Sequence, residues 1–298
     1  MKSPLTGRPV LFGEVLFDHF PDGEVVLGGA PFNVAWHLNA FGARPVLISR
    51  VGNDALGRRI RDAMQSWQMD TSGLQLDSAH PTGTVDVSIE HGEPHYDIVE
   101  QRAWDFIDAG SLPPVTDAAL LYHGSLALRS PVSRLALDSL RANLDAPVFL
   151  DVNLRPPWWN RESVEHHLNT ARWVKLNDDE LEALTPTGRS LAQRAAALQQ
   201  AYGLELLITT LGGEGALAHN NTGHSLQVKP TATDTVTDTV GAGDAFAAVI
   251  ILGLLNAWEL EQTLQRAQTF ASAIVGLRGA TPGQQDFYTV FRQHWNLM

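Results

Sequence analysis

The most informative stretch of this chain is Asp238-Thr-Val-Gly-Ala-Gly-Asp-Ala-Phe-Ala-Ala248. Gly241, Ala242 and Gly243 carry little or no side chain, so the backbone N–H groups of their turn can approach an anion closely. The residues from Ala245 to Leu255 are apolar on every face, which predicts a buried helix whose positive dipole end faces the glycines. The stretch therefore predicts a phosphate-binding turn at the start of a buried helix.

Asp244 lies in the first turn of this predicted helix. A carboxylate in that position either caps the free N–H groups or faces the bound ligand as a general base, and the residue alone leaves both interpretations open. Its surroundings favour the second, because Asp238 and Thr239 precede the turn. The complete pattern D-T-x-G-A-G-D-x-F resembles the carboxyl-terminal signature of the ribokinase-like, or PfkB, family of sugar kinases.

A second pattern lies near the other end of the chain. It runs Gly28-Gly-Ala-Pro-Phe-Asn-Val-Ala35 and is followed by Val51-Gly-Asn-Asp-Ala-Leu-Gly57. Both segments resemble the amino-terminal signature of the same family, G-G-x-x-x-N-x-A and then V-G-x-D-x-x-G. In physical terms, Gly28 and Gly29 let the backbone approach a ligand, and Asn33 offers a donor and an acceptor to neighbouring hydroxyls. Two independent matches in the family's order predict that the chain is a member.

The composition agrees with an enzyme of this kind and excludes several other classes. With 298 residues, 44% of them hydrophobic, the chain can bury one large α/β core, and we expect a single domain over residues 1–298. The net charge of −12 and the scattered basic residues argue against a nucleic-acid partner. Cysteine is absent, which excludes disulfides, thiolate nucleophiles and cysteine-based zinc sites.

The sequence also gives no sign of a membrane segment or a metal cluster. The longest apolar run, Ala245 to Leu255, is far shorter than the roughly 18 residues of a membrane span. The amino terminus lacks the apolar stretch of a signal peptide, so a cytoplasmic location is the default expectation. Four histidines lack partners at metal-ligand spacing and are expected at the surface. They are His166, His167, His219 and His224.

Short apolar runs alternate with helical patterns along the chain. This order predicts a doubly wound, mostly parallel sheet flanked by helices, with ligands at the carboxyl ends of the strands, and the family has this fold. The predicted strands are Pro9–Phe17, Pro45–Val51, Ala119–His123, Val148–Val152, Trp173–Leu176 and Glu205–Thr210. Besides the helix after the glycine turn, the predicted helices are Phe32–Phe41, Leu56–Trp67, Pro131–Asn143, Val164–Ala171 and Leu191–Tyr202.

One region departs from this alternation. Residues Thr82 to Glu100 alternate apolar and polar side chains around a His91-Gly-Glu93 turn, which predicts a hairpin. The resemblance implies that residues 19–28 and 82–106 form a small antiparallel β lid over the sugar, which also serves as a homodimer surface. Because Asp105 follows this hairpin, we expect it to reach the sugar. An ordinary edge hairpin of the main sheet is the alternative.

Further sugar-site residues follow from the resemblance. Asp18 ends the first predicted strand, where the family has a carboxylate that accepts hydrogen bonds from sugar hydroxyls. Asp151-Val-Asn-Leu-Arg155 opens a run that resembles the D-x-N-x-R-x-x-x-W pattern of fructokinase-like members. In that pattern Asp151 and Asn153 lie at the sugar, although Asp151 can equally be a strand-end cap. Because lysines are few, we expect Arg155 to be the cation that steadies the phosphoryl oxygens.

The metal sites are likewise implied by the resemblance. Asn177-Asp-Asp-Glu180 fits the family's N-x-x-E motif, in which the Asn177 amide and the Glu180 carboxylate organise waters around Mg²⁺. A helix start is the alternative interpretation of those four residues. Asp238 and the carbonyl of Val240 are the implied ligands of a monovalent cation. Thr237 stands where the family usually has an apolar residue, so potassium dependence stays open.

The nucleotide site is expected at the segment Thr210-Leu-Gly-Gly-Glu-Gly215. This segment resembles the family's T-x-G-x-x-G turn, which passes under the ATP phosphates, and it assigns Thr210, Gly212 and Gly215 to ATP binding. The segment Ala273 to Gly283 would close over the base. A glycine-rich turn without a ligand is the alternative. A P-loop pattern is absent from the sequence, so ATP binding of the P-loop type is excluded.

The resemblance implies in-line phosphoryl transfer from MgATP. Asp244 would accept the proton of a primary sugar hydroxyl while the N–H groups of Gly241 to Gly243 take up charge on the transferring group. The motifs look most like the bacterial fructokinase branch, which favours D-fructose and its 6-phosphate. Ribose, 2-keto-3-deoxygluconate and a nucleoside are the alternative acceptors. A sugar-binding regulator without catalysis is a different class of function, disfavoured by the retained Asp244, Asn177 and Glu180.

Overall fold

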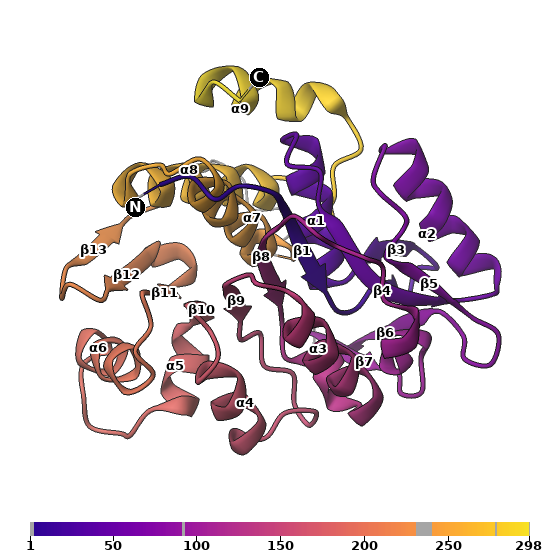
Figure 1. Ribbon diagram of the computed structural model, residues 1–298, viewed down its shortest axis with the longest axis horizontal. Helices are drawn as coiled ribbons and strands as arrows, with labels where there is room; N and C mark the ends of the chain where they lie inside the picture. Colours follow the sequence, from indigo (N-terminus) through magenta and orange to yellow (C-terminus); the bar gives the residue numbers. More distant parts are fainter. Residues whose placement is uncertain (1–2, 91–92, 231–239, 278, 298) are drawn as a thin grey trace.

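A nine-stranded sheet forms the centre of the described structure (Figure 1). The computed structural model describes residues 3–90, 93–230, 240–277 and 279–297. Neighbouring strands are parallel from one edge to β11, and the last two strands are antiparallel. In spatial order the strands are β13 (Ser225–Val228), β12 (Ala216–Asn220), β11 (Leu206–Thr210), β10 (Trp173–Asn177), β9 (Val148–Asp151), β8 (Ala118–His123), β1 (Arg8–Phe12), β4 (Val46–Gly52) and β5 (Leu74–Asp77).

Helices cover both faces of this sheet, as the expected doubly wound fold requires (Figure 1). One face carries α1 (Ala30–Ala40), α2 (Ala55–Ser66), α7 (Ala242–Leu255), α8 (Leu260–Val275) and α9 (Gln285–Trp295). The other carries α3 (Pro131–Asn143), α4 (Arg161–Leu168), α5 (Asp178–Leu184) and α6 (Leu191–Ala201). Each face has its own cluster of buried apolar side chains. The predicted fold class is therefore confirmed.

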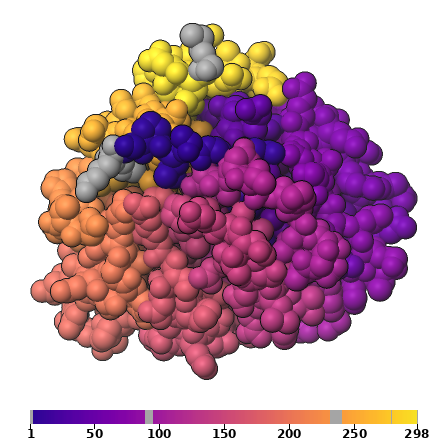
Figure 2. Space-filling model, viewed as in Figure 1, coloured from indigo at the N-terminus to yellow at the C-terminus, as the bar shows by residue number. Residues whose placement is uncertain are grey.

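Figure 2 shows the surface of the protein in the same view as Figure 1, with α9 (yellow) at the top. In this view the amino-terminal residues (indigo) lie between the carboxyl-terminal part (yellow and orange) and the middle of the chain (magenta). Within the described ranges, no helix is long and apolar enough to cross a membrane.

The predicted first strand, Pro9–Phe17, is wrong as a single element. β1 ends at Phe12, and β2 (Leu16–His19) belongs to a second sheet. The chain leaves the main sheet at Gly13, where φ is 149° and an added Cβ would lie 2.6 Å from Pro31 Cγ. Only glycine fits this crossing, and it places Asp18 in the second sheet instead of at the end of a core strand.

The second sheet has the strand order β3 (Val25–Gly28), β2, β6 (Gly83–Glu90) and β7 (Glu93–Ile98). β2 pairs with β3, and β6 with β7, in antiparallel fashion, whereas β2 and β6 are parallel. The hairpin is therefore part of a separate small sheet, and the alternative of an edge hairpin on the main sheet is wrong. We call these four strands the lid sheet.

The root of the lid sheet is fixed by two carboxylates. Asp54 caps α2 through Gly57 N (2.7 Å) and also accepts hydrogen bonds from Thr82 N (2.8 Å) and Thr82 Oγ1 (2.7 Å). Burial alone would raise the pKa of Asp54, but these hydrogen bonds lower it below its usual value. Asp54 belongs to the V-G-x-D-x-x-G signature, whose role here is to tie α2 to Thr82, the residue just before β6.

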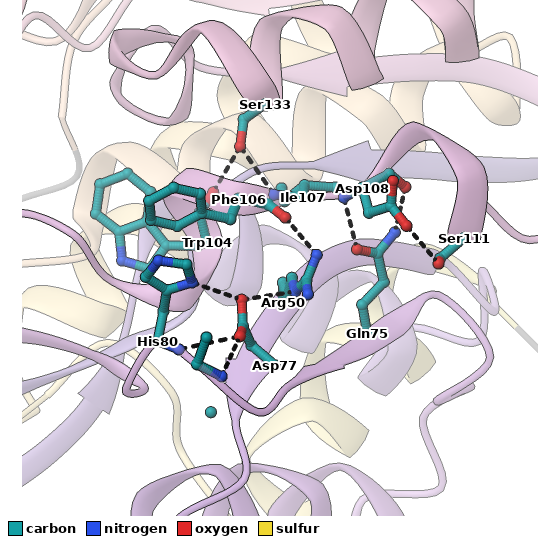
Figure 3. Close-up of polar contacts among 12 residues, drawn as sticks. Arg50, Gln75, Asp77, His80, Trp104, Phe106, Ile107, Asp108, Ser111 and Ser133 are labelled. Atoms are coloured by element: carbon teal, nitrogen blue, oxygen red, sulfur yellow. Dashed lines mark hydrogen bonds and ion pairs between the residues drawn. The ribbon is translucent and has the colours of Figure 1, made fainter.

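Asp77 is the second carboxylate of this root (Figure 3). It accepts from Ala79 N (2.7 Å), from the backbone N (3.0 Å) and Nδ1 (3.0 Å) of His80, and it pairs with Arg50 Nε at 3.0 Å. Arg50 also donates to the carbonyl of Phe106 at 2.6 Å, and the His80 ring stacks on the Phe106 ring. His80 precedes the lid hairpin and Phe106 follows it. The network therefore joins both ends of the hairpin to β4 and β5.

The surface expectation is wrong for two of the four histidines. His167 and His219 are buried, whereas His166 and His224 are exposed. His167 lies on the inner face of α4, where its ring packs edge-on against His123. Burial lowers the pKa of His167 to about 3, so this ring is a neutral core side chain.

Candidate active site

A cleft of about 710 Å³ opens where β1, β9, β10 and β11 end and the lid sheet begins. The lid contributes apolar and aromatic side chains to its wall, among them Val85, Tyr96 and Ile98. Most of the predicted site residues line this cleft. They are Asp18, Gly29, Asn33, Asp151, Asn153, Arg155, Asn177, Glu180, Thr210, Val240, Gly241, Gly243 and Asp244. Residues from both ends of the chain thus meet at the edge of the sheet where parallel strands leave room for ligands.

The glycine turn forms one side of the cleft. Gly241 precedes α7 with φ 82°, a left-handed conformation, and an added Cβ would overlap Ala280 and lie 2.8 Å from its Cα. Glycine has no side chain with which to cap the helix, so the first N–H groups of α7 are available to an anion. Ala242 begins α7 but is not part of the cleft wall.

Asp244 faces the cleft from the first turn of α7. Its Oδ2 accepts a hydrogen bond from Asn33 Nδ2 at 2.8 Å, which links the two signature motifs directly. Burial raises the pKa of Asp244 to about 6, against the opposing effect of Asn33, and the nearby charge of Asp151 raises it further. A carboxylate with this pKa is well suited to accept a proton near neutral pH.

Glu14 is a cleft residue that the sequence analysis did not identify. Its side chain is 3% exposed, and Oε2 has no hydrogen-bond partner among the described residues. Burial raises its pKa to about 7, and the Asp244 charge adds to this effect. Glu14 follows Gly13, where the chain passes from the main sheet to the lid sheet. The sequence pattern did not show this passage, so it could not place Glu14 in the cleft.

Lys175 is the second missed residue. It lies in the middle of β10, and its Nζ is 2.9 Å from both Oδ1 and Oδ2 of Asp151 on the neighbouring strand. Tyr122 OH also donates to Asp151 Oδ2, at 3.2 Å. The cleft thus holds a lysine in addition to the expected arginine, because Lys175 and Arg155 both line it. A lysine inside an apolar strand was the available signal.

The N-x-x-E motif is a capping box at the start of α5. Asn177 Oδ1 accepts from Glu180 N, and Glu180 Oε2 accepts from Asn177 N, both at 2.8 Å. Glu180 Oε1 accepts from Leu154 N at 2.6 Å. The helix-start interpretation is thus correct, yet both residues also line the cleft. Each Glu180 oxygen retains a second lone pair, which leaves it able to bind metal-coordinated water.

Several predicted residues lie outside this cleft. Asp105 forms a buried ion pair with Arg129 (2.8 Å), so the structure does not bring it to the site. Gly28 lines a smaller adjoining cavity of about 70 Å³, together with Asp18 and Asn33. Gly212 and Gly215 lie in the turn after β11 but not in the cleft wall. Asp238 lies outside the described residues.

This arrangement can be compared with known proteins. A family model described as "pfkB family carbohydrate kinase" matches residues 11–286. The chain belongs to the pfkB family of carbohydrate kinases. A fructokinase of Salmonella typhimurium is 32% identical to it, over 94% of this chain and 98% of the relative. A probable fructokinase-2 of Arabidopsis thaliana is 27% identical, over 93% of this chain and 92% of the relative.

Solved structures agree with this assignment. A double mutant of the fructokinase of Vibrio cholerae O395, bound to fructose, ADP and potassium ion, has a TM-score of 0.81 and 26% identity. The match covers 97% of the kinase and 99% of that chain. A fructokinase of Xylella fastidiosa with bound ATP has a TM-score of 0.82 at 21% identity, over 97% and 99% of the two chains, and supports the fold alone.

The donor set of the kinase fits a magnesium nucleotide better than a bare metal ion. Among the described side chains, no group of three histidines, aspartates or glutamates is spaced to hold a metal ion. Mg²⁺ commonly binds proteins through one or two carboxylates, water and substrate phosphates. Glu180 and the glycine turn lie on the same cleft and could supply the water contact and the phosphate contact respectively.

Proposed function

We propose that the kinase transfers the γ-phosphate of MgATP to a primary hydroxyl of a small sugar, and that D-fructose is its acceptor. The observation that carries the reaction is the position of Asp244 beside the uncapped start of α7. In the proposed reaction Asp244 is the proton acceptor, and the N–H groups at this helix start bind the phosphate within the same cleft. The fructose acceptor is supported by the fructokinase relatives and by the fructose-bound structural neighbour.

In this proposal the sugar lies between Asn33, Asp18 and the lid sheet. Asp244 removes the proton of the attacking hydroxyl as its oxygen bonds to the γ-phosphorus. The bond from that phosphorus to the bridging oxygen breaks, and ADP leaves with the electron pair. The N–H groups at Gly241 to Gly243 take up charge on the transferring oxygens, and closure of the lid sheet would exclude water.

Mg²⁺, a monovalent cation and a lid-mediated homodimer complete the proposal. Magnesium would bridge the ATP phosphates and reach Glu180 through water. Val240, which lines the cleft, would contribute its carbonyl to a monovalent cation. The potassium-bound neighbour supports this last site. The lid carries the exposed Tyr96 next to the cleft, which is consistent with a partner on that surface.

A coupled ADP-release assay tests the acceptor. The purified kinase is supplied with MgATP and with fructose, ribose, 2-keto-3-deoxygluconate or adenosine in separate reactions. We expect the highest kcat/KM with fructose, and ³¹P NMR of the product should show a 6-phosphate. Turnover confined to another acceptor would overturn the fructose proposal but keep the reaction. Absence of turnover on all four, with sugar binding intact in calorimetry, would favour a regulator.

A further inference from the structure

The floor of the cleft contains a buried ion pair between two neighbouring parallel strands. Lys175 of β10 is directly opposite Asp151 of β9, and both side chains are almost completely buried, with 6% and 1% of their surface exposed. The ammonium of Lys175 bonds both carboxylate oxygens at 2.9 Å. Two charge-assisted hydrogen bonds to one carboxylate therefore hold the ammonium in a defined position.

The ion pair uses only two of the three N–H donors of the Lys175 ammonium. An ammonium group has three N–H donors, and Asp151 receives two of them from Lys175. Within the described part of the chain, no other hydrogen bond from Nζ is found. Lys175 nevertheless lines the cleft. Its third N–H is therefore available to an oxygen of a bound ligand.

The ammonium lies beside the glycine turn. A Cβ added to Gly243 would be 3.5 Å from Lys175 Nζ, so the charge is adjacent to the first turn of α7. The positive charge of Lys175 also acts on Asp244, whose pKa it lowers against the larger effect of burial. Nζ is thus close to both groups that would handle the transferring phosphoryl and the attacking hydroxyl.

We propose that Lys175 is a catalytic cation of the kinase, that it donates a hydrogen bond to an oxygen of the transferring phosphoryl group, and that Asp151 holds it in place. This inference rests on the phosphoryl transfer proposed above. The lysine keeps its proton throughout: Asp244 takes the hydroxyl proton, and ADP leaves with the electrons of the broken P–O bond. Burial alone would lower the pKa of Lys175, but Asp151 raises it above its usual value, which keeps the ammonium charged.

This assignment changes the role of Asp151. Both of its oxygens already accept from Lys175, and Oδ2 also accepts from Tyr122. These three hydrogen bonds leave only one of the roughly four lone-pair sites of the carboxylate, on Oδ1, for a sugar hydroxyl. Asp151 is therefore a positioning residue, and recognition of the sugar falls to Asp18 and Asn33, which line both the main cleft and the adjoining cavity.

The test must separate catalysis from simple stabilisation, because breaking a buried ion pair destabilises a protein by leaving one charge uncompensated. We would compare Lys175→Met, Asp151→Asn and the double variant Lys175→Met/Asp151→Asn with the wild-type kinase. The double variant removes both charges and so avoids the unpaired carboxylate. Lys229→Met is the matched control, since Lys229 is exposed and lies outside the cleft. Thermal unfolding of each variant accompanies the kinetics.

We expect Lys175→Met to lower kcat by about 10²–10³-fold, because one hydrogen-bond donor to the transition state is lost. The KM for MgATP and the KM for the sugar should change much less. The double variant should recover thermal stability but not kcat, and Asp151→Asn should lower kcat at unchanged KM. Lys229→Met should resemble wild type. A folded double variant with wild-type kcat would overturn the inference. A wild-type protein that fails to turn over any sugar would instead refute the proposed reaction, so the two failures are distinguishable.

Discussion

The carboxylates of the lid root and those of Glu14 and Asp244 in the cleft have opposite pKa shifts. At the lid root, Asp54 and Asp77 accept three or more hydrogen bonds each, and these bonds lower the pKa of both carboxyls against the effect of burial. In the cleft, Glu14 and Asp244 receive far fewer, and burial raises the pKa of both. A carboxylate that the protein satisfies holds structure together, whereas one that it leaves unsatisfied is available to a substrate.

The contrast also separates the two amino-terminal signature segments. Asn33, from G-G-x-x-x-N-x-A, donates a hydrogen bond to the carboxylate of Asp244, the proposed base. Asp54, from V-G-x-D-x-x-G, instead caps α2 and accepts hydrogen bonds from Thr82 at the lid root. One motif therefore builds the site and the other positions the element that covers it.

The largest effect that would sharpen this comparison is expected for Glu14→Gln. The folded-state pKa of Glu14 is raised from 4.5 to about 7, so its contribution to stability is complete below pH 4.5 and is lost as the pH rises through 7. Removing the carboxyl should raise the free energy of unfolding at pH 8 by roughly 2–4 kcal/mol, and less at pH 5. Urea unfolding at several pH values measures it, with Glu214→Gln, an exposed site, as control. An unchanged pH slope would contradict the prediction.

A smaller effect of opposite sign is expected for Asp77→Asn. Its pKa is lowered in the folded state, so its contribution is present above the unfolded value of 3.8 and is lost as the pH falls through the folded-state pKa. The amide cannot accept from His80, Arg50 and Ala79 together, which should cost about 1–3 kcal/mol of unfolding free energy near neutral pH. Thermal or urea unfolding measures this loss. If the variant instead lost turnover while keeping wild-type stability, the lid root would belong to the catalytic machinery.

The sequence predicted the regular parts of the fold because their patterns are local. The helix Pro131–Asn143 is reproduced without change, and α7 is buried as its all-apolar sequence indicates. The end of β1 before Gly13 was missed because the apolar pattern continues past this residue into β2. The antiparallel strands β12 and β13 were also missed, since short strands with polar residues give little periodic signal.

In the site, the sequence predicted the residues of the motifs but not their partners. Lys175 was missed because the small number of lysines favoured an arginine, and nothing local shows that Asp151 lies opposite Lys175 on the next strand. Asp105 was placed near the sugar because it follows the lid hairpin, yet Arg129, distant in sequence, binds its carboxylate. His167 and His219 were expected at the surface but are buried. The sequence does not show this, because burial of a lone histidine depends on tertiary packing. Each error concerns a contact between segments far apart in the chain.

One measurement tests the central claim most directly: turnover and unfolding free energy of Asp244→Asn beside wild type at pH 8. The asparagine can still accept from Asn33 but cannot take a proton. We expect kcat with MgATP and fructose to fall by about 10²–10⁴-fold. Because the pKa of Asp244 is raised to about 6, removal of the charge should leave the variant at least as stable as wild type. A variant that keeps wild-type turnover, or that loses activity only because it unfolds, would contradict the account.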